Sequence, residues 1–100
     1  MNDLNWKIQI QPKASKQLAK LSPKDRVRVS FSIEELAVAH NPTIVPGVKH
    51  LKGSNPKQWR QRQGNYRIIF GIEASKFVQL DLEYKGRLII HSVSLHHTGY

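Results

Sequence analysis

Three arginines lie close together in a part of the sequence whose pattern predicts a β-hairpin. Arg60 and Arg62 are two residues apart in a predicted strand over 57–63, and Arg67 follows a glycine-containing turn at 64–65. Because successive side chains of a strand point to opposite faces, Arg60 and Arg62 should share one face. Arg67, on the second strand of the hairpin, should lie beside them on the same face. Planar guanidinium groups hydrogen-bond phosphate oxygens in pairs, so this spacing predicts a phosphate-binding surface.

The surrounding charge supports the same interpretation. The 100-residue chain has 16 Lys and Arg against 7 Asp and Glu, a formal net charge of +9, and no acidic residue between Glu35 and Glu73. Such a balance favours polyanionic partners: nucleic acid, the ribosome, an anionic membrane or an acidic protein. We expect Lys49, Lys52 and Lys57 to extend the surface along an RNA backbone. The alternative is that the arginine row is only a solvated face of a strand.

Histidines near the C-terminus supply groups that can exchange a proton near neutral pH. His96 and His97 are adjacent at the end of the last predicted strand, and Tyr100 follows closely. If this strand lies beside Arg67, a ribose 2′-hydroxyl could be deprotonated and attack the neighbouring phosphate, while an acid protonates the leaving 5′-oxygen and cations stabilise the transition state. His91, in phase with apolar neighbours, is interpreted as a packed core residue or a residue that supports the site from behind.

The sequence contains no motif for binding a metal or a cofactor. The chain has no cysteine, the histidines lack a ligand spacing such as H-x-x-x-H, and no phosphate-binding glycine loop or G-x-S-x-G is found. The sequence therefore predicts a site without metal or cofactor. No apolar run approaches the length of a membrane span and nothing resembles a signal peptide, so we expect a cytoplasmic protein with no membrane association.

The elements that position these residues can be placed by periodicity. Alternation predicts strands over 6–11, 57–63, 65–73, 77–83 and 87–96, with turns at 74–76 and 84–86, and the 3.6-residue period predicts helices over 13–21 and 23–40. Several residues are expected to face the core: Ile8, Ile10, Val27, Phe31, Ile33, Leu36, Ala37, Val38. Ile89, His91, Val93 and Leu95 are expected to share one face of the last strand, and Val78, Leu80 and Leu82 one face of the strand before it.

This order predicts an α+β fold: a small, mostly antiparallel sheet packed on an N-terminal helical hairpin. The length fits a single domain over 1–100. Trp59, on the face away from the arginines, is interpreted as a core anchor, and Tyr66 is given the same interpretation.

The hairpin and its surroundings resemble the RelE/ParE superfamily of bacterial toxin–antitoxin toxins. The resemblance lies in three segments, Leu51-Lys52-Gly53, Trp59-Arg60-Gln61-Arg62 and Gly64-Asn65-Tyr66-Arg67-Ile68-Ile69-Phe70, and extends over about residues 6–100. It implies the fold described above. In the RelE branch it implies a ribosome-associated endoribonuclease that cleaves mRNA and is neutralised by a cognate antitoxin, expected to be acidic and DNA-binding.

Site roles follow from the same resemblance. Arg60 and Arg62 correspond to paired basic residues around the attacking 2′-hydroxyl, and Arg67 to the phosphate-binding arginine of the Y-R-I motif. His96 takes the basic position at the end of the last strand and Tyr100 the aromatic one, with His97 beside them as an RNA contact. Because arginine stays protonated, the acid–base role passes to His96 or His97. Two alternatives stay open: a ParE-like, non-catalytic inhibitor of DNA gyrase, and a non-toxic RNA-binding relative.

Overall fold

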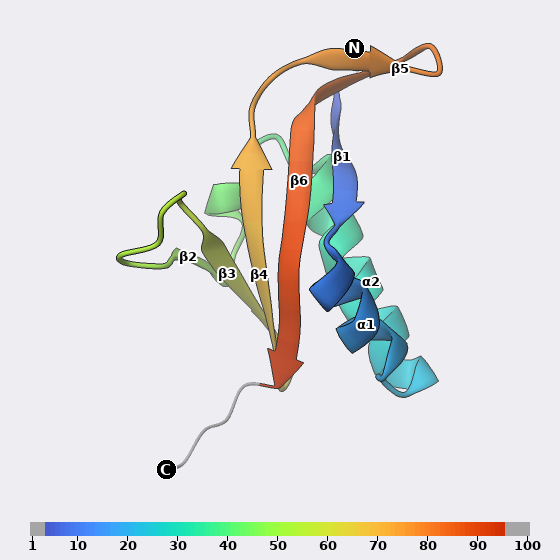
Figure 1. The fold of residues 1–100 in the computed structure, drawn as a ribbon, viewed down its shortest axis with the longest axis vertical. Helices are drawn as coiled ribbons and strands as arrows, with labels where there is room; N and C mark the ends of the chain where they lie inside the picture. Colours follow the sequence, from blue (N-terminus) through green and yellow to red (C-terminus); the bar gives the residue numbers. More distant parts are fainter. Residues whose placement is uncertain (1–3, 96–100) are drawn as a thin grey trace.

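The computed structural model describes residues 4–95, in which two helices pack on one face of a six-stranded sheet (Figure 1). The elements are β1 (Asn5–Ile10), α1 (Pro12–Ala19), α2 (Pro23–Val38), a short 3-10 helix η1 (Pro42–Ile44), β2 (Val48–His50), β3 (Trp59–Gln63), β4 (Tyr66–Glu73), β5 (Phe77–Gln79) and β6 (Leu82–Leu95). The order across the sheet is β1-β6-β4-β3-β2, with β5 paired to β6. Only β1 and β6 run parallel among these pairs, so the predicted α+β fold with a mostly antiparallel sheet is confirmed.

The helical hairpin forms where the sequence provides start and stop signals. Ser22 caps α2 by accepting a hydrogen bond from the backbone N–H of Asp25 at 3.2 Å, and Pro23 occupies the first turn. The Arg26 guanidinium then donates to the carbonyls of Leu18, Ala19 and Leu21. These bonds satisfy the free carbonyls at the end of α1 and fix the short connection between the helices.

The core lies between the helices and the inner face of the sheet. Its buried apolar residues are Trp6, Ala14, Val29, Ile33, Leu36, Ala37, Ile68, Phe70, Leu88, Ile90 and Val93. Ile33, Leu36 and Ala37 were correctly predicted, and Ile8 is partly buried against the core. The predictions for Val27, Phe31, Val38 and Ile10 are wrong, because these side chains are 69, 61, 59 and 41% exposed. Helix α2 rests on the stripe that includes Val29 and Ile33, and this turns the Val27–Phe31 stripe outward.

The β3–β4 hairpin has the predicted register. Gln63 pairs with Tyr66 across a turn containing Gly64, whose φ of +57° is a conformation that glycine adopts readily. Trp59 lies opposite Phe70, and their rings stack with centroids 6.2 Å apart. Trp59 and Tyr66 both pack against the core, as predicted.

The last two strands differ from the prediction. The chain reverses at Leu80–Asp81, both with positive φ, so that Gln79 pairs with Leu82 and a single β6 continues through the turn predicted at 84–86. At Gly86 a Cβ would lie 2.0 Å from the Glu73 carbonyl oxygen. This glycine therefore permits close contact between strands rather than a turn. Val78, Leu80 and Leu82 share no buried face and are all exposed.

A β-bulge in β6 changes which side chains share a face. Ile69 pairs with Ser92 whereas the next residue, Phe70, pairs with Ile90, so His91 is the extra residue of β6. Ile90 and Val93 consequently both point into the core. The expected common face of Ile89, His91, Val93 and Leu95 is therefore wrong, because the alternation is interrupted at His91.

Candidate phosphate-binding face

The three arginines lie together on the sheet face opposite to the helices, which we call the open face. Arg62 is directly opposite Arg67, and Arg60 is opposite Ile69, two residues further along β4. Their neighbours in sequence, Gln61 and Ile68, point the other way and are buried. The hairpin thus places three guanidiniums on adjacent strands, as the sequence predicted. Lys49 of β2 lies opposite Arg60 and adds a fourth cation.

These cations have no anionic partner within residues 4–95. None of the three arginines forms an ion pair there, and the Nε atom of Arg67 is buried without a hydrogen-bond partner in that range. Like charges placed directly opposite one another on a sheet destabilise it. A buried donor left unpaired adds a further penalty of about 1–3 kcal/mol. An arrangement that lowers stability and leaves donors unused is typical of a binding site for an anion.

Lysines extend this surface toward one edge of the sheet. Lys52 and Lys57 are both exposed in the connection between β2 and β3. The Asn55–Pro56 peptide bond in this connection is cis. Lys49 is thus on the strand next to the arginine hairpin, and Lys52 and Lys57 are in the connection between β2 and β3, at the edge of the sheet (Figure 1).

Strand β6 lies next to the Arg67 strand, as the ribonuclease hypothesis requires. Ser94 pairs with Arg67, and Leu95, the last described residue, pairs with Tyr66. His96, His97 and Tyr100 lie outside the described residues, so their roles stay predictions.

His91 is a candidate functional residue that the sequence interpretation missed. It lies on the open face rather than in the core, with its imidazole over Gly71 of β4: a Cβ at Gly71 would be 2.9 Å from the Nε2 atom. Burial lowers the pKa of His91 below its usual value, so its ring is neutral at pH 7. A glycine in mid-strand was the available signal, because it often marks a bulge or the close approach of another group.

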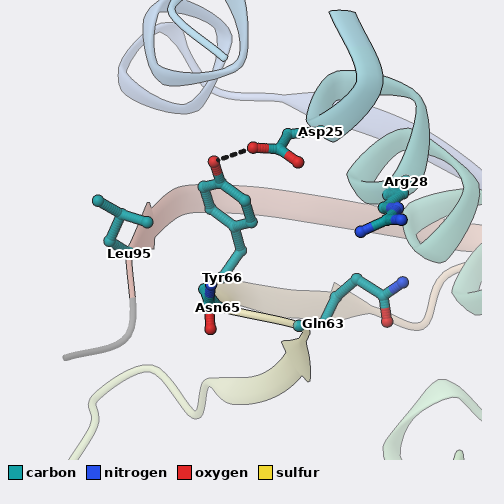
Figure 2. Close-up of a pocket in the computed structure, with 7 residues that line it drawn as sticks. Asp25, Arg28, Gln63, Asn65, Tyr66 and Leu95 are labelled. Carbon is teal, nitrogen blue, oxygen red and sulfur yellow. Dashed lines mark hydrogen bonds between the residues drawn. The ribbon is translucent and has the colours of Figure 1, made fainter. Parts of the chain in front are cut away.

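A cavity lies on the helix side of the β3–β4 hairpin (Figure 2). It has a volume of about 300 Å³ and is lined by Asp25, Arg28, Gln63, Gly64, Asn65, Tyr66 and Leu95. The Tyr66 hydroxyl donates a hydrogen bond of 2.7 Å to Asp25 Oδ2. This bond to the carboxylate, together with burial, raises the pKa of Tyr66. The bond joins β4 to the first turn of α2, so Tyr66 fixes the hairpin against the helices.

The part of the chain that the structure describes has neither a cluster of metal ligands nor a membrane-spanning helix. Residues 4–95 contain no group of three or more His, Asp or Glu side chains that could hold a metal ion. None of the helices in this range is long and apolar enough to cross a membrane.

Comparison with known proteins identifies the fold. No family model and no curated protein matches the sequence. Among solved structures, a chain of the archaeal RelE–RelB complex from Pyrococcus horikoshii OT3 matches with a TM-score of 0.71 and 17% identity, covering 96% of this chain and 100% of that one. The chain has the RelE toxin fold. The RelBE2 toxin–antitoxin complex of Mycobacterium tuberculosis also matches the RelE-like fold, with a TM-score of 0.63, 17% identity, and coverage of 93% and 100%.

Proposed function

We propose that this protein is the toxin of a toxin–antitoxin system and a metal-independent endoribonuclease that cleaves mRNA in association with the ribosome. The observation that carries the proposal is the set of three guanidiniums, Arg60, Arg62 and Arg67, which have no ion-pair partner within residues 4–95 and lie on the open face of a RelE-like sheet. A gyrase inhibitor has no need of a phosphate clamp beside proton-exchanging residues. Both structural neighbours are RelE complexes, and they give no support to the ParE alternative.

In the proposed reaction the arginines hold the scissile phosphate and neutralise the charge that develops on it. The ribose 2′-oxygen forms a bond to phosphorus as its proton passes to a base, and the bond from phosphorus to the 5′-oxygen breaks as that oxygen takes up a proton. We propose that His96 takes part in this proton exchange as the acid or the base, with Tyr100 stacking on or orienting a nucleobase. Lys49, Lys52, Lys57 and His97 contact the adjoining RNA backbone.

The proposed protein partner is a cognate antitoxin. Both structural neighbours are complexes of a toxin with its antitoxin. An acidic antitoxin would neutralise the open face, because the arginines and lysines there have no carboxylate of their own within residues 4–95. Val27 and Phe31 on the outer side of α2 line an exposed groove of about 300 Å³ and add apolar surface for such a protein. We propose that the neighbouring gene encodes this antitoxin with a DNA-binding end.

The decisive experiment maps new mRNA 5′ ends after purified protein is added to translating ribosomes and, separately, to naked RNA. We expect cuts at fixed positions within codons in the ribosome sample. The matched control is the triple variant Arg60→Gln/Arg62→Gln/Arg67→Gln, which keeps polar side chains at the three positions but removes the charges. It should fold normally and produce no cuts.

Cleavage of naked RNA as well would restrict the proposal to a free-standing ribonuclease. Absence of cuts in both samples would contradict the nuclease function. Full cleavage by His96→Ala and His97→Ala variants would contradict the assignment of proton exchange to the C-terminal histidines.

A further inference from the structure

The β6 bulge places a neutral imidazole on the open face, beside the arginines. His91 is the residue of β6 that has no partner in the β4 ladder. In a regular strand the side chains of Ile90 and Ser92 would both point to the face opposite His91. The bulge instead places Ile90 and Val93 in the core, and His91 and Ser92 on the open face. Bulges occur preferentially where a side chain must be redirected, including positions next to active sites.

Gly71 shapes the space that the imidazole occupies. Its backbone has no positive φ that would demand glycine, yet a Cβ there would lie 2.9 Å from His91 Nε2. The missing side chain on β4 therefore leaves free the space over Gly71 that the ring of His91 occupies. Gly71 itself is buried beneath this ring.

The sheet register gives the spacing between His91 and the arginines. On the open face of β4, Ile69 lies between Arg67 on one side and Gly71 on the other, and Arg60 is opposite Ile69 on β3. Two residues along a strand span roughly 7 Å. A phosphate held by Arg60 and Arg67 above Ile69 would therefore lie about one such step from the His91 ring, which is over Gly71.

We propose that His91 is a catalytic residue, the proton acceptor for the ribose 2′-hydroxyl in the proposed ribonuclease reaction. This inference rests on the proposed function. The 2′-oxygen forms its bond to phosphorus while its proton moves to His91 Nε2. The 5′-oxygen leaves phosphorus and takes a proton from His96, which then acts as the acid.

Burial keeps the ring of His91 in its accepting form. The cations nearest to it by sheet register are Arg60, which is opposite Ile69 on β3, and Arg87, which is opposite Glu73. The nearest acid on the same face, Glu73, is engaged by Arg87 at 3.2 Å. Burial lowers the pKa of His91 and so disfavours the imidazolium, which leaves Nε2 able to accept a proton at pH 7.

The test measures single-turnover cleavage by wild type, His91→Ala and His91→Gln under the conditions in which the wild type cuts RNA. We expect the cleavage rate to fall about 100- to 10,000-fold in both variants, the usual range for loss of an acid–base group. Binding of an RNA with a 2′-deoxyribose at the cut site should be unchanged. The rate of the wild type should fall as the pH is lowered and His91 gains a proton, and this dependence should disappear in the variants.

Two further variants separate catalysis from structure. His50→Ala removes an exposed histidine of β2 and should cleave like the wild type. Gly71→Ala keeps His91 but pushes its ring away. It should cleave slowly, unfold at a temperature close to that of the wild type, and cause no further loss when combined with His91→Ala.

The outcomes distinguish failure of the role of His91 from failure of the proposed ribonuclease function. If the wild type cleaves and His91→Ala cleaves within about threefold of it, the role of His91 is wrong while the ribonuclease function stands. Weakened binding of the 2′-deoxy RNA with an unchanged rate would also overturn it, since this would mean a contact rather than a base. If the wild type cleaves no RNA at all, the proposed function and this inference both fail.

Discussion

The two faces of β4 show how one strand serves two purposes. Toward the helices it presents Tyr66, Ile68 and Phe70, which pack against α2 and the rest of the core. Toward the open side it presents Arg67, Ile69 and Gly71, in a surface of unpaired cations with His91 across it. The inner face of β4 consists of side chains that pack in the core, whereas the outer face carries like charges opposite one another and the buried Nε of Arg67 without a partner within residues 4–95. Residues adjacent in sequence should therefore respond to mutation in opposite ways.

The largest expected effect is on the inner face, at Ile68. This side chain is fully buried, so Ile68→Ala should lower the free energy of unfolding by about 2–5 kcal/mol through lost burial and a residual cavity. Chemical denaturation measures this change. RNA cleavage per folded molecule should stay near that of the wild type. A selective loss of cleavage without loss of stability would remove the distinction between the two faces.

The neighbouring residue Arg67 should show the reverse behaviour. Arg67→Ala should reduce the cleavage rate about 100- to 1,000-fold, comparable to removal of a transition-state donor. The free energy of unfolding should be unchanged or higher, because a buried unpaired Nε is removed. Arg67→Lys is the matched control: it keeps the charge but not the planar pair of donors, and should recover part of the activity. Unfolding of Arg67→Ala would show that Arg67 is chiefly structural.

A smaller effect is expected at Arg62, which lies opposite Arg67. Arg62→Gln should raise the free energy of unfolding by about 0.2–1 kcal/mol, because it relieves like-charge repulsion across the strand pair. The gain should shrink in high salt, where exposed charges are screened. Urea denaturation at two ionic strengths tests both statements. A destabilised variant would mean that the outer face carries no stored repulsion.

The smallest effect concerns pH and the inner-face residue Tyr66. The Asp25 hydrogen bond raises the pKa of Tyr66 in the folded state above its ordinary value of 10.0. The folded protein therefore holds this proton more tightly than the unfolded chain. The resulting stability is fully present below pH 10 and is lost as the pH rises through the folded-state pKa. Melting temperatures from pH 8 to 11 should fall less steeply for Tyr66→Phe than for the wild type. Equal slopes would contradict this linkage.

The sequence was most informative where local signals agreed. Strict alternation, the Gly64 turn and the position of Arg67 together gave the β3–β4 hairpin and its charged face, because register in a hairpin follows from the turn. The turn at Leu80–Asp81 was missed, since positive φ values at these residues have no glycine to indicate them. The glycine that was read as a turn, Gly86, instead accommodates the Glu73 carbonyl.

Helix α2 shows a different kind of limit. Its apolar residues are distributed over more than one face, so periodicity did not decide between the stripe of Val27 and Phe31 and the stripe of Val29 and Ile33. Only packing against the sheet selects one of them. The exposed stripe is then left for solvent or a partner.

By itself, the sequence determined the α+β class, the helical hairpin, the position of the arginines on one hairpin face and the resemblance to RelE. These follow from short-range rules: side-chain alternation, helix capping and turn chemistry. The tertiary structure decided the bulge in β6, and with it the transfer of His91 from an expected core position to the open face. A bulge arises from pairing between strands about 20 residues apart in sequence, so a mid-strand glycine such as Gly71 can suggest one but no local pattern in either strand fixes its position.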